Sequence, residues 1–444
     1  MPGRPPAAFF LCVCPARPAD GREAQGYTWC DDKFLGAPAA AALAFAIWNM
    51  TQTLYSGLNG KNITLAVTGG IAAYKSCELV RLLIKSGAHV RVCMTQAALH
   101  FVGSLTFAAL SGNPVVVEPL DGSMQHIALT RDCDLLLVAP ATADMIAKVA
   151  SGVADDLVSS VILASRCPAV FCPAMNCNMW AKAATQRNVD QIKADGYAVL
   201  GPACGVLACG DSGAGRMIEP AEIVASVARM LSPQLLAGKR VVVTAGPTYE
   251  AIDPVRGITN LSSGKQGYAV AQAAFEAGAQ VTLISGPTAL EAPIGIETHH
   301  VVSGEQMREH AMKACEKADV FVSVAAVADW RLEAVSDHKI KKTGEPPQLK
   351  LVENPDILAD VAKAYPALYC VGFAAETDDI LENARAKRVK KNVRMIVANN
   401  AAKAIGSDKN EAWIVTATSE AATGAMSKQA LAARIIKAVA ADLA

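Results

Sequence analysis

The chain lacks net charge, and it also lacks any long apolar run. Its 444 residues hold 41 basic and 41 acidic side chains, so the formal net charge at pH 7 is zero. A balanced chain has no overall field that attracts nucleic acid or an anionic membrane, although a local basic patch is compatible with this balance. No stretch reaches the roughly 18 consecutive apolar residues that a transmembrane helix requires. We therefore expect neither a nucleic-acid partner nor a membrane span.

Charged residues are scarce, and the cysteines do not suit a disulfide scaffold. Charged side chains make up 18% of the chain and apolar ones 52%, which indicates a well-buried globular protein rather than a disordered one. Thirteen cysteines are too few for a disulfide-bonded scaffold of this length, and their number is odd. We expect free thiols and a cytoplasmic location. A length of 444 residues favours two domains over one.

The first 49 residues lack any sustained helical or strand periodicity. Arg4 leads into a brief apolar run at Ala7–Val13, which is a poor match to a secretory signal. We expect residues 1–49 to be a disordered extension, or upstream sequence translated from a start codon that is set too early. Met50, shortly before the first expected strand, is a sensible natural start.

Two parts of the chain repeat the same order of strand, glycine turn, helix and strand. The first begins with an apolar run, a turn, a helical stretch and a second apolar run, at Ile63–Val67, Thr68–Gly70, Ala72–Ser86 and His89–Met94. This order is typical of a parallel sheet. Ser232-Pro233 and Ala237-Gly238 interrupt the pattern, which restarts with the apolar run Arg240–Thr248. We predict an α/β fold of two tandem Rossmann-like, three-layer domains with mostly parallel sheets, at 60–232 and 238–444.

A glycine-rich stretch, Gly201–Met217, ends the first half. It holds five glycines and two cysteines, and almost nothing in it favours a helix or a strand. Reactive side chains such as Cys209 and Asp211 argue against a flexible tether, so we predict a mobile flap over an active site, with Cys209 as its reactive group. A zinc site is the alternative suggested by the spacing of Cys172, Cys177, Cys204 and Cys209. We disfavour zinc because the first of these cysteines lies in an expected buried strand.

Small or polar residues follow several expected strands of the first half. Thr68–Gly70 either brings backbone N–H groups to a phosphate at a helix N-terminus or is a plain tight turn. It is not a GxGxxG motif, and no acidic residue follows the second strand, so a mononucleotide is favoured over NAD. Thr142 can contact such a ligand or cap a helix, and Asn176 can orient a carboxylate or cap the next helix. His126 is either catalytic or structural.

The second half offers polar groups at similar places. Asn260–Lys265 superficially resembles a P-loop, but Gln266 stands where a serine or threonine would hold Mg²⁺. The stretch can still bind an anion as a polar entrance to a helix. Lys339–Lys342 is either a solvated basic patch or a clamp on a polyphosphate. Asp329, at the end of an apolar strand, could contact a ribose or a metal ion.

These stretches together resemble a known family. The motifs that carry the resemblance, in chain order, are TGGIAAYK, HIAL, APATAD, PAMNCNMW, ACGDSGAGRM, TAGPT, DPVRGITNLSSGKQG, AAVADW, KIKK, ENPDIL, VGFAAET and AKRVKK. They resemble the bifunctional phosphopantothenoylcysteine decarboxylase / phosphopantothenate–cysteine ligases of bacterial coenzyme A biosynthesis, over about residues 60–444. The whole set is far more specific than any one of its members.

The resemblance implies a ligase in residues 238–444. This enzyme would use CTP and Mg²⁺ to activate 4′-phosphopantothenate as an acyl-cytidylate, which cysteine then attacks. Asn260 would engage the acyl intermediate, Lys339 would stabilise charge on the reacting phosphate, and Asp329 would be the metal contact. The implied CTP contacts are Ser323, Val324, Ala325, Asp329, Lys339, Pro355, Asp356, Ile357, Leu358, Phe373, Lys387 and Lys391.

The resemblance also implies an FMN-dependent decarboxylase in residues 60–232, which would convert 4′-phosphopantothenoyl-cysteine to 4′-phosphopantetheine. His126 would act as a base, Asn176 would hold the substrate carboxylate, and Cys209 would protonate the enethiolate that precedes the product. The implied FMN contacts are Gly69, Gly70, Thr95, Thr142 and Ala174. The related flavin-containing cysteine decarboxylases are homo-oligomers, so we expect a homo-oligomer here.

Two other classes of function stay open. The first half could be a non-catalytic flavoprotein with a regulatory role, although the joint presence of His126, Asn176 and Cys209 argues against this. An NAD-dependent enzyme is disfavoured because the dinucleotide fingerprint is absent. The preference for CTP over ATP rests on the resemblance alone.

Overall fold

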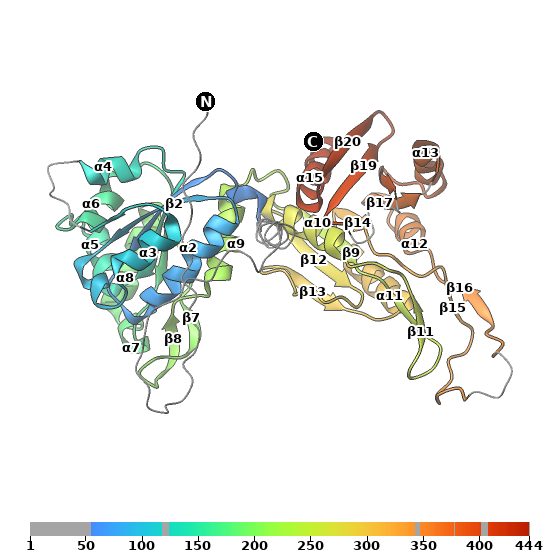
Figure 1. Ribbon diagram of the computed structural model, residues 1–444, viewed down its shortest axis with the longest axis horizontal. Helices are drawn as coiled ribbons and strands as arrows, with labels where there is room; N and C mark the ends of the chain where they lie inside the picture. The colour runs from blue at the N-terminus through green and yellow to red at the C-terminus, as the bar shows by residue number, and fades with distance from the viewer. Residues whose placement is uncertain (1–54, 118–123, 342–346, 377, 401–406, 444) are drawn as a thin grey trace, which may run out of the picture. The chain divides into compact units, whose positions relative to one another are not determined.

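The computed structural model describes residues 55–117, 124–341, 347–376, 378–400 and 407–443. The expected extension at 1–49 lies outside these ranges. Two large sheets, each covered by helices on both faces, make up most of the described chain (Figure 1). The predicted α/β fold with mostly parallel sheets is confirmed. No helix in the described ranges combines the length and the apolar character needed to cross a membrane.

The first sheet has six strands in the order β3-β2-β1-β4-β5-β6, and all of its pairs are parallel. The strands are β1 (Asn62–Val67), β2 (His89–Met94), β3 (Val115–Val116), β4 (Leu135–Ala141), β5 (Ala169–Pro173) and β6 (Ala198–Val199). Strand β1 contributes Ile63 and Leu65 to one buried cluster and Ala66 to another, as expected where successive side chains point to opposite faces.

Helices cover both faces of this sheet. Their main members are α2 (Lys75–Lys85), α3 (Ser104–Ser111) and α9 (Pro220–Leu231) on one face, and α4 (Gln125–Thr130), α5 (Ala143–Ala150), α6 (Leu157–Ala164) and α8 (Ala183–Ala194) on the other. The short helices are η1 (Ser56–Leu58), η2 (Ile71–Tyr74), η3 (Gln96–His100) and α7 (Cys177–Trp180). Because both faces are buried, polar side chains inside the strands, such as Thr64 and Arg91, are hydrogen-bonded to neighbouring backbone.

The second sheet has eight strands in the order β13-β12-β9-β14-β17-β18-β19-β20. Only the pairs β18–β19 and β19–β20 are antiparallel. The strands are β9 (Arg240–Ala245), β12 (Gln280–Ser285), β13 (Glu297–His300), β14 (Val320–Ser323), β17 (Tyr369–Glu376), β18 (Met395–Asn400), β19 (Lys409–Val415) and β20 (Glu420–Ser427). Helices α10 (Lys265–Glu276) and α15 (Lys428–Leu443) cover one face, and α11 (Gly304–Cys315), α12 (Ile357–Ala364) and α13 (Ile380–Lys390) cover the other.

Three hairpins extend from the two sheets. They are formed by β7 (Ala203–Val206) and β8 (Ser212–Arg216), by β10 (Tyr249–Ala251) and β11 (Gly257–Thr259), and by β15 (Trp330–Leu332) and β16 (Leu351–Glu353). The β7–β8 hairpin differs from what the sequence of Gly201–Met217 leads us to expect. The glycine-rich stretch, whose composition favours neither helix nor strand, is an antiparallel hairpin, because its glycines permit a close approach that larger residues would prevent.

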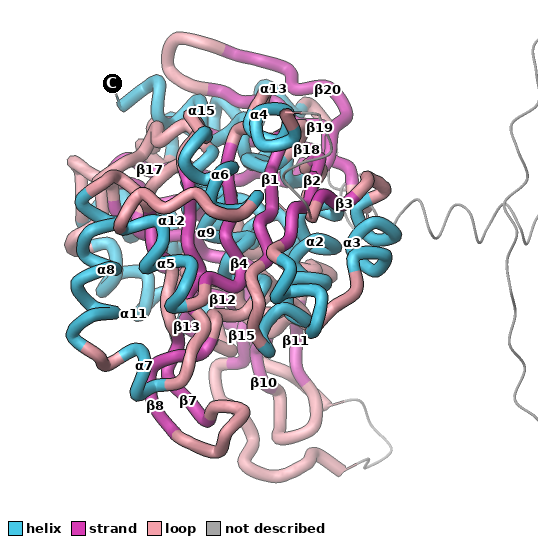
Figure 2. Tube along the Cα trace, turned by 90° about the vertical axis from the view of Figure 1, so that its left-hand side faces the viewer, coloured by secondary structure: helices cyan, strands magenta, loops and turns pink. Residues whose placement is uncertain are grey.

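That close approach is clearest at Gly215 in β8. A Cβ atom there would lie 2.3 Å from the carbonyl oxygen of Met175, whose N–H donates to the Gly215 carbonyl oxygen at 2.9 Å. A Cβ at Gly213 would lie 2.9 Å from Cys177 Cβ. The hairpin is therefore fastened against the segment that follows β5. Figure 2 shows β7 and β8 beside α7.

We expect Gly215→Ala to destabilise the first half by about 1–3 kcal/mol, because the new methyl group forces the hairpin away from Met175. Chemical denaturation followed by circular dichroism measures this change. Gly103→Ala is the matched control, since a Cβ at Gly103 meets no atom within 4 Å. Equal stability of the two variants would contradict the packing described here.

Candidate functional site

The residues expected to contact FMN lie together at the carboxyl edge of the first sheet. They follow four neighbouring strands: Gly69 and Gly70 follow β1, Thr95 follows β2, Thr142 follows β4 and Ala174 follows β5. A Cβ at Gly69 would lie 2.5 Å from Ala97 Cβ, so only glycine fits the turn after β1 against the turn after β2. This edge is where open parallel sheets bind ligands.

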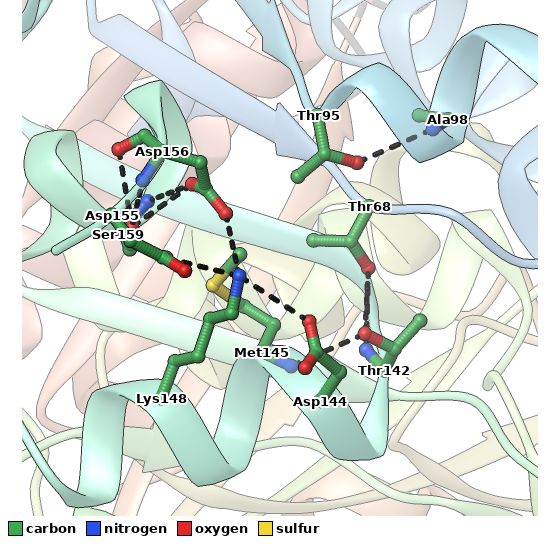
Figure 3. Close-up of polar contacts among 10 residues, drawn as sticks. All are labelled: Thr68, Thr95, Ala98, Thr142, Asp144, Met145, Lys148, Asp155, Asp156 and Ser159. Carbon is green, nitrogen blue, oxygen red and sulfur yellow. Dashed lines mark hydrogen bonds and ion pairs between the residues drawn. The ribbon is translucent and has the colours of Figure 1, made fainter. Parts of the chain in front are cut away.

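Hydrogen bonds lock the turns after β1 and β4 together (Figure 3). Thr68 Oγ1 donates to the Pro140 carbonyl oxygen at 2.7 Å and accepts from the Thr142 N–H at 3.2 Å. Thr142 Oγ1 accepts from the Met145 N–H at 3.3 Å, so this residue does cap α5. A Cβ on Gly70 would lie 3.6 Å from Thr142 Cγ2, so Thr142 also lies beside the turn that is expected to contact FMN.

Lys148 ties the beginning of α6 to helix α5 (Figure 3). Its Nζ lies 3.0 Å from Asp155 Oδ1, 3.1 Å from Asp156 Oδ2 and 3.7 Å from Asp144 Oδ2. The hydrogen bond to Asp155 is the largest cause that raises the pKa of Lys148. Asp156 also forms a capping box with Ser159 at the start of α6. The network therefore fixes α5, the helix that Thr142 caps.

A second constellation joins the segment after β5 to the hairpin turn. Asn176 Nδ2 donates to Cys209 Sγ at 3.2 Å and to Asp211 Oδ2 at 2.8 Å, and the Cys209 thiol donates to the same Oδ2 at 3.3 Å. The Asn176 bond is the first cause, and the Cys209 bond the second, that lower the pKa of Asp211. Asn176 Oδ1 caps α7 by accepting from the Asn178 N–H, so the amide has both roles that the sequence allows. Two donors thus converge on one carboxylate oxygen.

His126 is not part of this constellation within the chain. It lies in α4, which leads into the amino end of β4, and Thr64 near the amino end of β1 donates to the Leu129 carbonyl oxygen in the same helix. Asn176 instead follows the carboxyl end of β5. Strand β4 alone spans roughly 20 Å at the usual rise per residue. Figures 1 and 2 both show α4 and α7 at opposite ends of the sheet.

A cavity of about 930 Å³ lies in the second half, at the carboxyl ends of β9, β14, β17 and β18. Asn260 and all of the expected CTP contacts except Lys339 line it. These are Ser323, Val324, Ala325, Asp329, Pro355, Asp356, Ile357, Leu358, Phe373, Lys387 and Lys391. Lys391 Nζ pairs with Asp356 at 3.1 Å, and Lys387 Nζ pairs with Glu376 at 2.7 Å. The cavity can therefore take a large polar ligand with cationic groups along one wall.

Asn260 holds the wall that follows β14. Its Nδ2 donates to the carbonyl oxygens of Ala326 and Val327, each at 3.1 Å. From the other side, Thr248 Oγ1 accepts from the Ala328 N–H at 3.0 Å. Among the described residues no donor reaches Asn260 Oδ1, so the oxygen of this amide is the atom available to a ligand.

Lys339 lies outside the cavity lining, on the exposed arm between β15 and β16. Its neighbour Ile340 is anchored: the Ile340 N–H donates to Asp253 Oδ2 at 3.1 Å, and Arg256 Nη2 donates to the Ile340 carbonyl oxygen at 3.0 Å. Asp253 is buried and also receives the Arg256 guanidinium, which is the main cause that lowers the pKa of this carboxyl group. The base of the arm is therefore fixed beside the β10–β11 hairpin.

Several functional candidates were not found by sequence reasoning. Asp211 stands two residues after Cys209 but was not assigned a role, although its closeness to a reactive thiol was a usable signal. The cavity is also lined by Asn399, Asn410 and Lys428, which no motif marks. Within the described ranges, no three His, Cys, Asp or Glu side chains gather as a metal-ion site, and this includes the cysteines considered for zinc.

We expect Asp211→Asn to speed alkylation of Cys209 by iodoacetamide at pH 7. The Asp211 carboxylate accepts the hydrogen bond of the Cys209 thiol and holds the sulfur toward itself, so its replacement by an amide leaves the sulfur free to turn toward the reagent. Peptide mass spectrometry measures the rate of alkylation of both hairpin thiols, Cys204 and Cys209. Cys204, which has no described bond to a carboxylate, is the internal control. An unchanged Cys209 rate relative to Cys204 would show that the observed contact is not maintained in solution.

Comparisons with known proteins cover nearly all of the described chain. The family model described as Flavoprotein matches residues 51–232, and that of the DNA/pantothenate metabolism flavoprotein C-terminal domain matches 236–443. A solved C-terminal domain of a coenzyme A biosynthesis bifunctional protein CoaBC aligns at 36% identity, over 47% of this chain and 98% of its own, with a TM-score of 0.42.

Two curated relatives match over most of their length. The chain is 46% identical over 390 residues to the coenzyme A biosynthesis bifunctional protein CoaBC of Vibrio parahaemolyticus, which is 86% of this chain and 98% of that one. It is 45% identical over 406 residues to the CoaBC of Mycobacterium tuberculosis, again 86% of this chain and 97% of the relative. The chain belongs to the family of coenzyme A biosynthesis bifunctional proteins CoaBC.

Proposed function

We propose that this chain catalyses two reactions of coenzyme A biosynthesis in two domains. Residues 238–444 join cysteine to 4′-phosphopantothenate with CTP, and residues 60–232 decarboxylate the resulting 4′-phosphopantothenoyl-cysteine with FMN. The proposal is supported by relatives that carry the bifunctional name over 86% of this chain. It is also supported by the presence of a separate candidate site at the carboxyl edge of each sheet.

The ligase reaction activates a carboxylate that otherwise lacks a leaving group. The substrate carboxylate attacks the α-phosphorus of CTP and pyrophosphate leaves; the cysteine amine then attacks the acyl carbon and CMP leaves with the C–O bond electrons. In this proposal Phe373, Lys387 and Lys391 hold the nucleotide. Asn260 Oδ1, which no donor of the described residues reaches, accepts a hydrogen bond from the attacking amine and orients it toward the acyl carbon.

Mg²⁺ and Lys339 complete the proposed ligase site. Mg²⁺ is usually held by one or two carboxylates together with substrate phosphates, which suits Asp329 in the cavity wall. Lys339 reaches the reacting phosphate only if its arm folds toward the cavity. Because the backbone of the neighbouring Ile340 is held by Asp253 and Arg256, this movement must break those hydrogen bonds.

In the decarboxylase, bound FMN supplies the oxidation and the return of electrons that release of CO₂ requires. The close fit of Gly69 against Ala97 and the hydroxyl groups of Thr95 and Thr142 suit a flavin mononucleotide at the sheet edge. The observation that carries the catalytic assignment is the convergence of Asn176 Nδ2 and the Cys209 thiol on one carboxylate oxygen of Asp211. A substrate carboxylate that takes the place of Asp211 would receive the same donors, and Cys209 would then deliver its proton to the enethiolate.

We further propose a homo-oligomer in the cytoplasm. His126 lies a strand length from Asn176 in one chain, so a base role for His126 requires that a second copy supply it. Large apolar side chains are exposed beside the candidate FMN site, including Ile71 at 64%, Tyr74 at 61% and Leu105 at 80%, which is typical of an interaction surface. The described cysteines are all free thiols, which suits a reducing compartment.

The two activities should separate by mutation. Cys209→Ser should abolish release of 4′-phosphopantetheine and leave CMP formation at the wild-type rate, because the thiol proton donor is lost while the ligase cavity is untouched. Lys339→Gln should lower CMP formation and leave decarboxylation of supplied 4′-phosphopantothenoyl-cysteine unchanged. Both rates are followed by chromatography of the products, with the flavin absorbance as a check on folding. Parallel loss of both activities in either variant would contradict separate sites.

Mixed oligomers should test where His126 acts. His126→Ala and Cys209→Ser should each be inactive as decarboxylases alone. In an equal mixture of co-expressed chains, about a quarter of sites would combine an intact His126 from one copy with an intact Cys209 from another, so about a quarter of the activity should return. A mixture as inactive as its parents would place all three catalytic residues in one chain.

A further inference from the structure

The ligase cavity crosses the carboxyl edge of its sheet and has two dissimilar ends. On the α12 and α13 side lie the residues expected to hold the nucleotide, and their lysines are paired with carboxylates. On the α10 and α15 side the lining comprises Gly264, Lys265, Gln266, Asn410 and Lys428. The resemblance to known ligases assigns no function to Lys428 or to its helix. The α10 and α15 end is therefore a part of the cavity that the proposed chemistry has not used.

Lys428 is the exceptional group at this end. It is only 7% exposed, yet its Nζ has no hydrogen-bond or ion-pair partner among the described residues. The neighbouring ammonium group of Lys265 is neutralised by Asp408 at 2.6 Å. Burial, and then the charge of Lys265, lower the pKa of Lys428. The Asp408 carboxylate, which is ion-paired with Lys265, partly offsets this by raising the pKa of Lys428 without contacting its Nζ. An ammonium group on so deeply buried a side chain is costly when its nearest carboxylate is shared, and a ligand that brings a further negative charge accounts for its retention.

The helix beside Lys428 offers matching donors. Gly264, the residue before α10, has the left-handed conformation and provides no side-chain cap, so the first N–H groups of the helix are left for an outside acceptor. The Gln266 side chain holds the two helix starts together, because its Nε2 donates to the Lys428 carbonyl oxygen at 3.2 Å and its Oε1 accepts from Asn410 Nδ2 at 3.4 Å. The positive end of a helix and a buried ammonium group thus face the same space.

We propose that Lys428 and the first turn of α10 form a binding subsite for a substrate phosphate group. The proposal rests on the proposed ligase function, which supplies two phosphate sources: the phosphomonoester of 4′-phosphopantothenate and the triphosphate of CTP. Either one brings the anion that Lys428 lacks. The carboxylates of the cavity lining, Asp329, Glu353 and Asp356, all come from the segments around β15, β16 and α12 and not from this end. The Asp408 carboxylate lies near this end, where it is ion-paired with Lys265.

Substitution of Lys428 by methionine keeps the length of the side chain and removes the charge. The KM for one phosphate-bearing substrate should rise about 10- to 100-fold, as expected for loss of a charge-assisted hydrogen bond. A rise for 4′-phosphopantothenate alone identifies the phosphomonoester, and a rise for CTP alone identifies the triphosphate. Lys428→Arg should recover part of the affinity. Lys437→Met, at an exposed position of the same helix, is the matched control and should change neither constant. Unchanged constants in Lys428→Met would overturn the proposal.

The stability of the same variant distinguishes a binding role from a structural one. Without ligands, Lys428→Met should raise the Tm by about 2–4 °C, because a buried charge with no contacting carboxylate is removed. A fall in Tm would show that Lys428 serves the fold and would overturn the proposal.

Inorganic pyrophosphate provides a test that needs no ligase turnover. It should raise the Tm of the wild-type chain and not that of Lys428→Met. An equal shift in both would contradict the subsite. Wild-type protein that gains stability from pyrophosphate but forms no CMP would instead refute the proposed ligase reaction while supporting the phosphate subsite.

Discussion

The burial of both faces of two parallel sheets is the constraint on which the rest of the structure depends. Strands such as β1, β4, β9 and β14 send alternate side chains into apolar clusters on either side, which leaves no room for unpaired polar groups along their length. Chemistry is therefore confined to the strand ends and to the segments that follow them. The candidate flavin edge and the ligase cavity both lie there, on separate sheets of one chain.

This constraint explains which site residues the sequence could predict. Gly69, Thr142 and Asn176 each stand directly after an apolar run, so a local pattern places them at the carboxyl edge. Lys428 also stands at an element boundary, but its burial depends on the packing of α15 against α10, which are far apart in the sequence. The hairpin at Ala203–Arg216 was missed for a related reason: its stability comes from contact with Met175 and Cys177 rather than from strand propensity.

Both candidate sites contain hydrogen-bond donors or charged groups whose proposed anionic partner is a ligand. Asn176 and Cys209 donate to Asp211, whose carboxylate has the chemistry of the proposed decarboxylase substrate. The backbone of Lys428 is hydrogen-bonded, but its buried side chain contacts no described acceptor through Nζ. Such sites lower the stability of the ligand-free protein, because donors and charges arranged for an anion lack a partner when the anion is absent. His126 illustrates a third case, in which the missing partner of a catalytic group is proposed to be another copy of the chain.

The central claim is that one chain performs ligation and then decarboxylation. The most direct measurement incubates the purified wild-type protein with 4′-phosphopantothenate, cysteine and either CTP or ATP, and follows CMP or AMP together with CO₂. The account predicts that CTP supports the release of CMP and of an equal amount of CO₂, with CO₂ appearing after CMP, and that ATP supports little of either. Release of CO₂ that does not depend on a nucleotide, or CMP formation that never leads to CO₂, would contradict it.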